Sequence, residues 1–209
     1  MTLLGLGRPL GRGATCAILL ALNATPVFAQ PAQIDAGDTA WMLVATGIVL
    51  MMSIPGLALF YCGMVRKKNV LATMAQTFAV VGLGSLLWMI IGYALAFTGD
   101  GRFIGSFTPL FLSGIGIDSV SPFAKTIPES LFMIYQMTFA VITVALVAGA
   151  VAERMRFSAF LWFSGLWLLF VYVPIAHWVW GGGFLGSAGL LDFAAGSRSE
   201  ERRVGKECR

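Results

Sequence analysis

The chain has 209 residues, of which 58% are hydrophobic and 11% are charged, and its mean hydropathy is +0.84. Soluble globular proteins carry about 25% charged residues, so this composition lacks the polar surface that water requires and indicates a membrane protein. The formal net charge of +4 comes from the ends of the chain, since residues 30–196 are close to neutral, and it provides no basic field for nucleic acid.

Residues 1–29 have the pattern of a secretory signal peptide. Arg8 and Arg12 form a basic start, residues 14–22 are a short apolar run, and residues 27–29 resemble a cleavage site. The apolar run is too short to cross a bilayer core of about 30 Å. We expect cleavage after Ala29, which leaves the mature N-terminus outside the cytoplasm; an uncleaved first helix is the alternative.

Four charge-free apolar runs follow, and each is near or above the ~20 residues that span a membrane as a helix. They cover residues 40–62, 73–97, 130–152 and 157–177. The runs are continuously apolar, whereas the strands of a membrane barrel alternate. The sequence therefore predicts an all-α, polytopic transmembrane helix bundle within residues 30–196, with a fifth helix starting near residue 190. Pro55 and Pro174 each remove a backbone donor, and we expect them to bend their helices.

Charges in the connectors predict the topology. Basic residues occupy positions 66–68 between the first two runs, and Arg154 and Arg156 lie between the third and fourth. Positive residues favour the cytoplasmic side. The connector of residues 98–127 and the region of Trp180 are then outside, which agrees with the signal peptide.

Residues 197–209 break the apolar pattern with eight charged side chains. No membrane helix continues through such a segment, because each charge at the bilayer centre costs roughly 2.5–3.5 kcal/mol. We expect this tail to be foreign to the protein, and a natural soluble end is the alternative.

Catalytic, metal and nucleotide chemistry find little support. His177 is the single histidine, and neither G-x-S-x-G nor G-x-x-x-x-G-K-[ST] occurs. Cys16, Cys62 and Cys208 are scattered, without the spacing of a disulfide framework or a metal site. We expect no catalytic residue, no metal and no cofactor. A serine–histidine dyad of an intramembrane enzyme is the alternative.

Aromatic residues near the outer ends of two runs favour a small cation. Trp178 and Trp180 close the fourth run, and a triplet of glycines after them predicts close backbone approach with carbonyls facing a cavity. An aromatic belt at the membrane interface is the alternative. Tyr135 and Phe139 are four residues apart and share a helix face. Ring faces attract a cation with about 0.5–2 kcal/mol each.

Asp192 adds a negative group between apolar residues. An acid is favoured at the start of a helix by the helix dipole. The carboxylate is therefore either a contributor to a cation site or a simple N-cap of the fifth helix, and the sequence leaves both open.

Three stretches carry a specific resemblance. They are PIAHWVWGGG at residues 174–183 with LDFA at 191–194, IPGLALFYCGMVRKKNV at 54–70, and GAVAERMRF at 149–157. Together they resemble the ammonium transporter (Amt/Mep/Rh) family. The resemblance implies a homotrimer in a bacterial inner (plasma) membrane, whose subunits each have eleven helices and a pore through their own centre. It also implies a possible PII-type cytoplasmic regulator.

The resemblance further implies roles for named residues. Trp180 and Phe139 correspond to the outer ammonium-recruitment site, with Phe139 also in the gate beneath it, and Tyr135 lines the same vestibule. Asp192 corresponds to the acid that shapes the site and supports transport. His177 belongs to the signature but is not a pore histidine. Family members pass ammonia and a proton separately, which avoids the barrier that an intact ion meets in an apolar pore.

The sequence departs from the family at the pore. The first pore histidine is expected eight residues beyond Asp192, and that position is Glu200; the second belongs to a later helix. We therefore expect these 209 residues to be a truncated, non-conducting fragment of an ammonium transporter. An ammonium sensor that uses the same fold within a longer chain is the alternative function.

Overall fold

The computed structural model describes residues 33–190, except positions 100, 109 and 117, and residue 192. The predicted signal peptide, the charged tail and most of the predicted fifth helix lie outside these residues. Within them, four helical spans are long and apolar enough to cross a membrane. They are Ala36–Met64, Lys67–Phe97, Glu129–Val151 and Phe157–Ser187. The prediction of a helical membrane bundle is confirmed.

Three of the four spans are built from several helical segments. The first span contains α2 (Ala36–Met51), a π-helical segment (Met52–Gly56) and α3 (Leu57–Met64). The second contains a 3₁₀ turn (Lys67–Asn69), α4 (Val70–Leu87), a π-helical segment (Trp88–Gly92) and α5 (Tyr93–Phe97). The third is α6 (Glu129–Val151). The fourth contains α7 (Phe157–Trp167), a π-helical segment (Leu168–Tyr172), α8 (Val173–Val179) and α9 (Phe184–Ser187).

The three π-helical segments share one geometry. At the end of each, a backbone N–H donates to the carbonyl five residues earlier: Leu57 to Met52, Tyr93 to Trp88, and Val173 to Leu168. Residues five apart are therefore brought to the same side of the span. Three such pairs are almost completely buried, namely Ser53 with Ala58, Trp88 with Tyr93, and Leu168 with Val173. Pro55 lies inside the first segment, and Pro174 is the second residue of α8, which follows the third.

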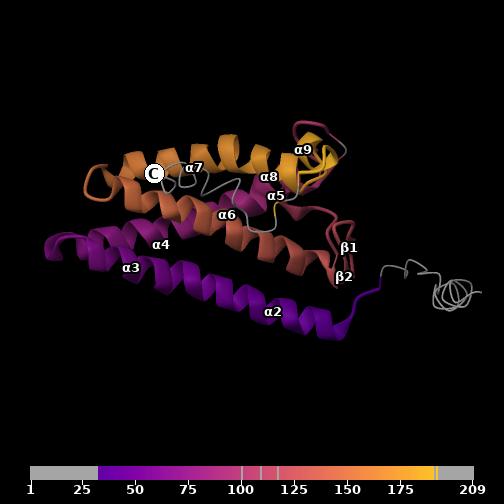
Figure 1. The fold of residues 1–209 in the computed structure, drawn as a ribbon, viewed down its shortest axis with the longest axis horizontal. Helices are drawn as coiled ribbons and strands as arrows, with labels where there is room; N and C mark the ends of the chain where they lie inside the picture. The colour runs from indigo at the N-terminus through magenta and orange to yellow at the C-terminus, as the bar shows by residue number, and fades with distance from the viewer. Residues whose placement is uncertain (1–32, 100, 109, 117, 191, 193–209) are drawn as a thin grey trace, which may run out of the picture. The chain divides into compact units, whose positions relative to one another are not determined.

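The second span lies at the centre of the packing. Its helix α4 packs against α3, α6 and α7, while α2 packs against α6 and α5 against α8. Figure 1 shows α2 and α3 along one edge of the bundle and α7 and α8 along the other. The ring of Trp88 is buried among Tyr93, Phe97 and Tyr172, with centroids 6.0–6.4 Å away, and its Nε1 donates to the Met133 carbonyl at 3.2 Å. This aromatic cluster joins the second, third and fourth spans.

A small antiparallel hairpin lies in the connector between the second and third spans. It pairs β1 (Val120–Ser121) with β2 (Ala124–Pro128), and a 3₁₀ turn (Leu110–Leu112) precedes it. The N–H of Asp35 donates to the Thr126 carbonyl at 2.8 Å, and the Asp35 side chain caps α2 by accepting from the N–H of Asp38. The hairpin was not predicted, and it fixes the start of the first span beside the third.

The two basic connectors meet at the opposite end of the bundle. Glu153 accepts hydrogen bonds from the Arg66 backbone N–H at 3.0 Å and from Asn69 Nδ2 at 2.8 Å, and its second oxygen lies 3.6 Å from Arg66 Nε. Both connectors therefore lie on one side of the bundle, as the topology prediction requires. The hydrogen bonds from Asn69 and Arg66, with the positive charges of Arg66 and Lys68, lower the pKa of Glu153 below its ordinary value of 4.5.

We expect this carboxylate to make the stability of the bundle depend on pH. A pKa that is lower in the folded state stabilises the fold above the unfolded value of 4.5, and the contribution is lost as the pH falls through the folded pKa. Thermal unfolding in detergent should show Glu153→Gln destabilised at neutral pH and equal to the parent in acid. The matched control Asp118→Asn also removes an exposed acid and should follow the parent. Equal pH profiles for parent and Glu153→Gln would contradict the prediction.

Candidate functional site at the C-terminal end of the fourth span

Helix α8 of the fourth span ends at the tryptophan and glycine cluster that the sequence singled out. Helix α8 ends at Val179, and the backbone N–H groups of Trp180 and Gly181 donate to the Ala176 carbonyl at 2.9 and 3.1 Å. Gly182 has φ +85, a left-handed conformation that favours glycine, and the N–H of Gly183 returns to the His177 carbonyl at 3.0 Å. The helix is therefore closed by a glycine cap before the short α9 begins.

His177 anchors the connector that follows the second span. The imidazole is fully buried, with Nδ1 2.9 Å from the Ala96 carbonyl oxygen and Nε2 2.6 Å from that of Gly101. Both partners are backbone groups more than 70 residues away in sequence. The histidine is thus committed to packing, in agreement with the expectation that it is not a pore histidine.

The glycine triplet permits close approach of the chain's own backbone. A Cβ atom at Gly181 would overlap the carbonyl oxygen of Ala96, and one at Gly183 would lie 2.6 Å from the Cα of Trp178. The sequence had suggested that this turn faces a cavity. At Gly181, the space that a side chain would fill is occupied by the C-terminal end of α5 instead.

Trp178 is also held by this connector. Its Nε1 donates to the Phe103 carbonyl at 2.7 Å, and its ring lies 5.4 Å from that of Phe184. The ring of Phe103 lies 5.6 Å from the same Phe184. His177 and Trp178 therefore tie the connector to α8 and α9.

Trp180 is brought together with Asp192. The indole Nε1 of Trp180 donates to the backbone carbonyl of Asp192 at 3.0 Å, and both residues are half-buried. The contact places the acid-bearing segment beside the tryptophan, through its backbone. Whether Asp192 caps a fifth helix depends on residues outside the described part of the chain.

Tyr135 and Phe139 form a second pair, on α6. Their rings are 5.1 Å apart in an edge-to-face arrangement, and both are half-buried. The structure thus assembles the predicted site residues as two pairs, one on the third span and one at the end of the fourth. Their meeting around a single vestibule stays a prediction from the resemblance.

A cavity of about 300 Å³ borders Tyr135 on the side of the first span. Asp38 and Trp41 of α2 line it, together with Gln136 of α6. Sequence reasoning did not assign the α2 residues to a site, because the predicted first run begins at residue 40 and leaves Asp38 in the segment before it, whereas α2 begins at Ala36. Their spacing of three residues, which places an acid and a ring on one helix face, was the available signal.

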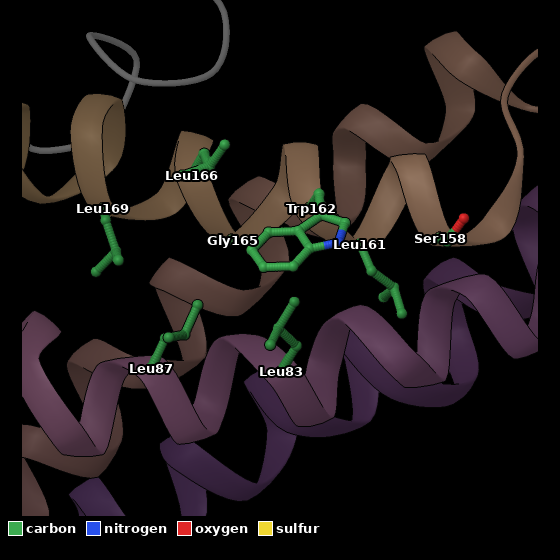
Figure 2. Close-up of a pocket in the computed structure, with 8 residues that line it drawn as sticks. All are labelled: Leu83, Leu87, Ser158, Leu161, Trp162, Gly165, Leu166 and Leu169. Carbon is green, nitrogen blue, oxygen red and sulfur yellow. The ribbon is translucent and has the colours of Figure 1, made fainter.

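A larger, apolar groove of about 370 Å³ lies between α4 and the fourth span. Figure 2 shows Leu83 and Leu87 of α4 on one side of it, with Leu161 and Leu169 of the fourth span on the other. Its lining residues are Leu83, Leu87, Ser158, Leu161, Trp162, Gly165, Leu166 and Leu169. None of these carries a charge, so the groove suits alkyl chains and not a small cation. Within the described residues, no three potential metal-ligating side chains gather.

Comparison with known proteins decides the family. The sequence profile of the Ammonium Transporter Family matches residues 40–198. The chain belongs to the ammonium transporter family. An ammonium transporter of Bacillus subtilis is 52% identical over 161 residues, which are 77% of this chain and 39% of that relative. An ammonium transporter of Aquifex aeolicus is 45% identical over 183 residues, which are 86% of this chain and 42% of the relative.

Solved structures of this family have the same fold. The crystal structure of Candida albicans Mep2 matches with a TM-score of 0.70 and 36% identity, over 79% of this chain and 36% of that one. The chain thus spans about two fifths of the length of these relatives. Membership confirms the predicted resemblance, the multi-pass membrane class and the assignment to transporters and not to enzymes.

Proposed function

We propose that this chain forms the outer entrance of an ammonium transporter, where Trp180, Phe139 and Tyr135 recruit ammonium before ammonia is conducted. The observation that carries the proposal is the assembly of two pairs of predicted site residues, the rings of Tyr135 and Phe139 and the Trp180 indole with the Asp192 backbone, in a chain of the ammonium transporter family. Half-buried rings offer their faces to a cation while excluding part of its water, which strengthens the attraction.

The rim and the pore act on different forms of the substrate, because a charged amine is costly to desolvate and neutral ammonia is not. A protonated amine is stabilised by ring faces and by the negative charge of Asp192, but an apolar pore opposes its entry as an ion. Neutral ammonia avoids that barrier. The rim is therefore the place where the cation is concentrated and its proton is given up.

Membrane orientation, assembly and regulation belong to the same proposal. We place the chain in a bacterial inner membrane with the mature N-terminus outside, supported by the basic connectors that Glu153 holds at one end of the bundle. A homotrimer and a PII-type regulator rest on the family resemblance alone. The sensor alternative gains no separate support from the described residues.

Trp180→Leu tests the proposal. The chain is completed with the remaining helices of the Bacillus subtilis relative and expressed in cells that lack ammonium uptake. Losing one ring removes a cation–π contribution of about 0.5–2 kcal/mol, so the half-saturating ammonium concentration should rise roughly 2- to 30-fold. Ammonium-dependent quenching of tryptophan fluorescence should fall with it.

Trp162→Leu is the matched control. Trp162 is 74% exposed beside the apolar groove, and its loss should leave uptake unchanged. Unaltered uptake and quenching in Trp180→Leu would overturn the recruitment site. A completed chain that carries no ammonium would overturn the function.

A further inference from the structure

We infer that a second outer site for a small protonated amine lies between the first and third spans, formed by Asp38, Trp41, Tyr135 and Gln136. The choice of ammonium as its ligand rests on the proposed function. The site is distinct from the Trp180 end of the fourth span, because its acid and one of its rings come from α2.

The site is a cavity with walls from three elements. Its volume is about 300 Å³, which accommodates an ammonium ion with several waters. Helix α2, strand β2 and helix α6 supply the lining residues, which are Asp38, Trp41, Met42, Ala124, Thr126, Ile127, Phe132, Tyr135 and Gln136. The hydrogen bond from the Asp35 N–H to the Thr126 carbonyl holds the first two elements together.

Gln136 supplies the observation that calls for a donor. Its Oε1 is buried and has no hydrogen-bond partner within the described part of the chain. A buried acceptor without a donor is unfavourable, and native proteins usually satisfy such groups. In the described conformation this oxygen is closed to water-sized groups, so ammonium reaches it by turning the Gln136 side chain towards the cavity that this residue lines. Ammonium carries four N–H donors, so it can then bond the oxygen and keep water or a carboxylate on its other sides.

The surroundings favour a positive ligand. Three aromatic residues, Trp41, Phe132 and Tyr135, border the cavity, and Asp38 contributes a carboxylate at its exposed edge. Lys125 lies between two lining residues in sequence, but it is exposed and does not line the cavity. The positive end of the α2 dipole is offset by Asp35 and Asp38 in and before its first turn.

Tyr135 connects this cavity with the proposed recruitment site. Its ring borders the cavity and also lies 5.1 Å from that of Phe139. A cation held at Asp38 and Gln136 is therefore one aromatic ring away from Phe139. The second site captures ammonium before it reaches the recruitment site and raises the ammonium concentration beside Tyr135 and Phe139.

Fluorescence titration of the whole chain in lipid nanodiscs tests the inference. Ammonium chloride is added at constant ionic strength against sodium chloride, and the contribution of Trp41 is obtained by difference from Trp41→Phe. We expect saturable quenching of Trp41 by ammonium and not by sodium. Asp38→Asn and Gln136→Met should each weaken it about tenfold, because one removes the charge and the other the acceptor.

Asp118→Asn is the matched control, since it removes an exposed outer-connector charge that does not line the cavity. It should leave the titration unchanged. Circular dichroism checks that each variant folds. If Asp38→Asn misfolds, Gln136→Met still tests the site, because methionine keeps the length of the side chain and removes only its polar groups. No Trp41 signal, an equal response to sodium, or titrations unaltered in both variants would overturn the second site. Unaltered ammonium uptake and quenching in Trp180→Leu would contradict only the recruitment site at Trp180, and not this second site.

Discussion

Replacing Gly181 with alanine is expected to detach the C-terminal end of α8 from α5 and to destabilise the protein by more than about 4 kcal/mol. The added Cβ would overlap the carbonyl oxygen of Ala96 and lie 2.8 Å from His177 Nδ1. Both obstacles are fully buried, so neither can move without breaking the hydrogen bond between them. Thermal unfolding of the chain in detergent, followed by circular dichroism, measures the loss.

Alanine substitutions at two other glycines are the controls, because they add the same methyl group without the overlap with Ala96. A Cβ at Gly182 meets open space, but its φ of +85 should make alanine cost about 1–2 kcal/mol. A Cβ at Gly82 within α4 also meets nothing within 4 Å, and Gly82→Ala should not lower stability. A melting temperature for Gly181→Ala that equals that of Gly182→Ala would show that the approach to Ala96 is not limiting.

His177→Leu should produce the second large effect. Leucine fills much of the space but removes the ring nitrogens that lie within hydrogen-bond distance of the carbonyls of Ala96 and Gly101. A neutral imidazole has one N–H, so one buried carbonyl loses its donor, at a cost of about 1–3 kcal/mol. We expect a loss of this size in unfolding free energy, with earlier proteolysis in the connector of residues 98–106. Limited proteolysis and thermal unfolding measure the two consequences.

The neighbouring tryptophan gives the control. Trp178→Phe also removes a hydrogen bond to the connector, the one to Phe103, but keeps an aromatic ring against Phe184. Its loss should stay below about 1.5 kcal/mol because that bond is exposed. If His177→Leu were as mild, the histidine would not be the anchor.

The membrane spans were predictable because burial in lipid demands long apolar helices, and hydropathy reports that demand directly. The π-helical segments were not, since residues 88–92 have the same apolar character as the helices around them. The hairpin at residues 120–128 was not predicted because the length of apolar runs identifies membrane spans and gives no signal for short strands in a connector. Its role depends on pairing with Asp35, a contact between distant parts of the sequence.

The candidate site was predictable only where motifs carry it. The signature around Trp180 and the spacing of Tyr135 and Phe139 identified the aromatic residues. The functions of Gly181 and His177 were not readable, because both depend on Ala96, about 80 residues earlier in the chain. The spacing of Asp38 and Trp41 indicated a shared helix face, but the cavity itself depends on β2 and α6, which supply its other walls.

The π-helical segments also set the angular phase of the helices that follow them. On a wheel of about 100° per residue, Trp88 and Tyr93 would point about 140° apart, yet both face the core. If the same residues wound as an ordinary α-helix, α5 would rotate by about 100°, and Tyr93 and Phe97 would turn towards lipid although the hydropathy of the span would not change. Deleting one residue together with that change would return both side chains to the core. The number of residues in each π-helical segment thus determines which side chains of the following helix face the core, independently of the hydropathy of the segment.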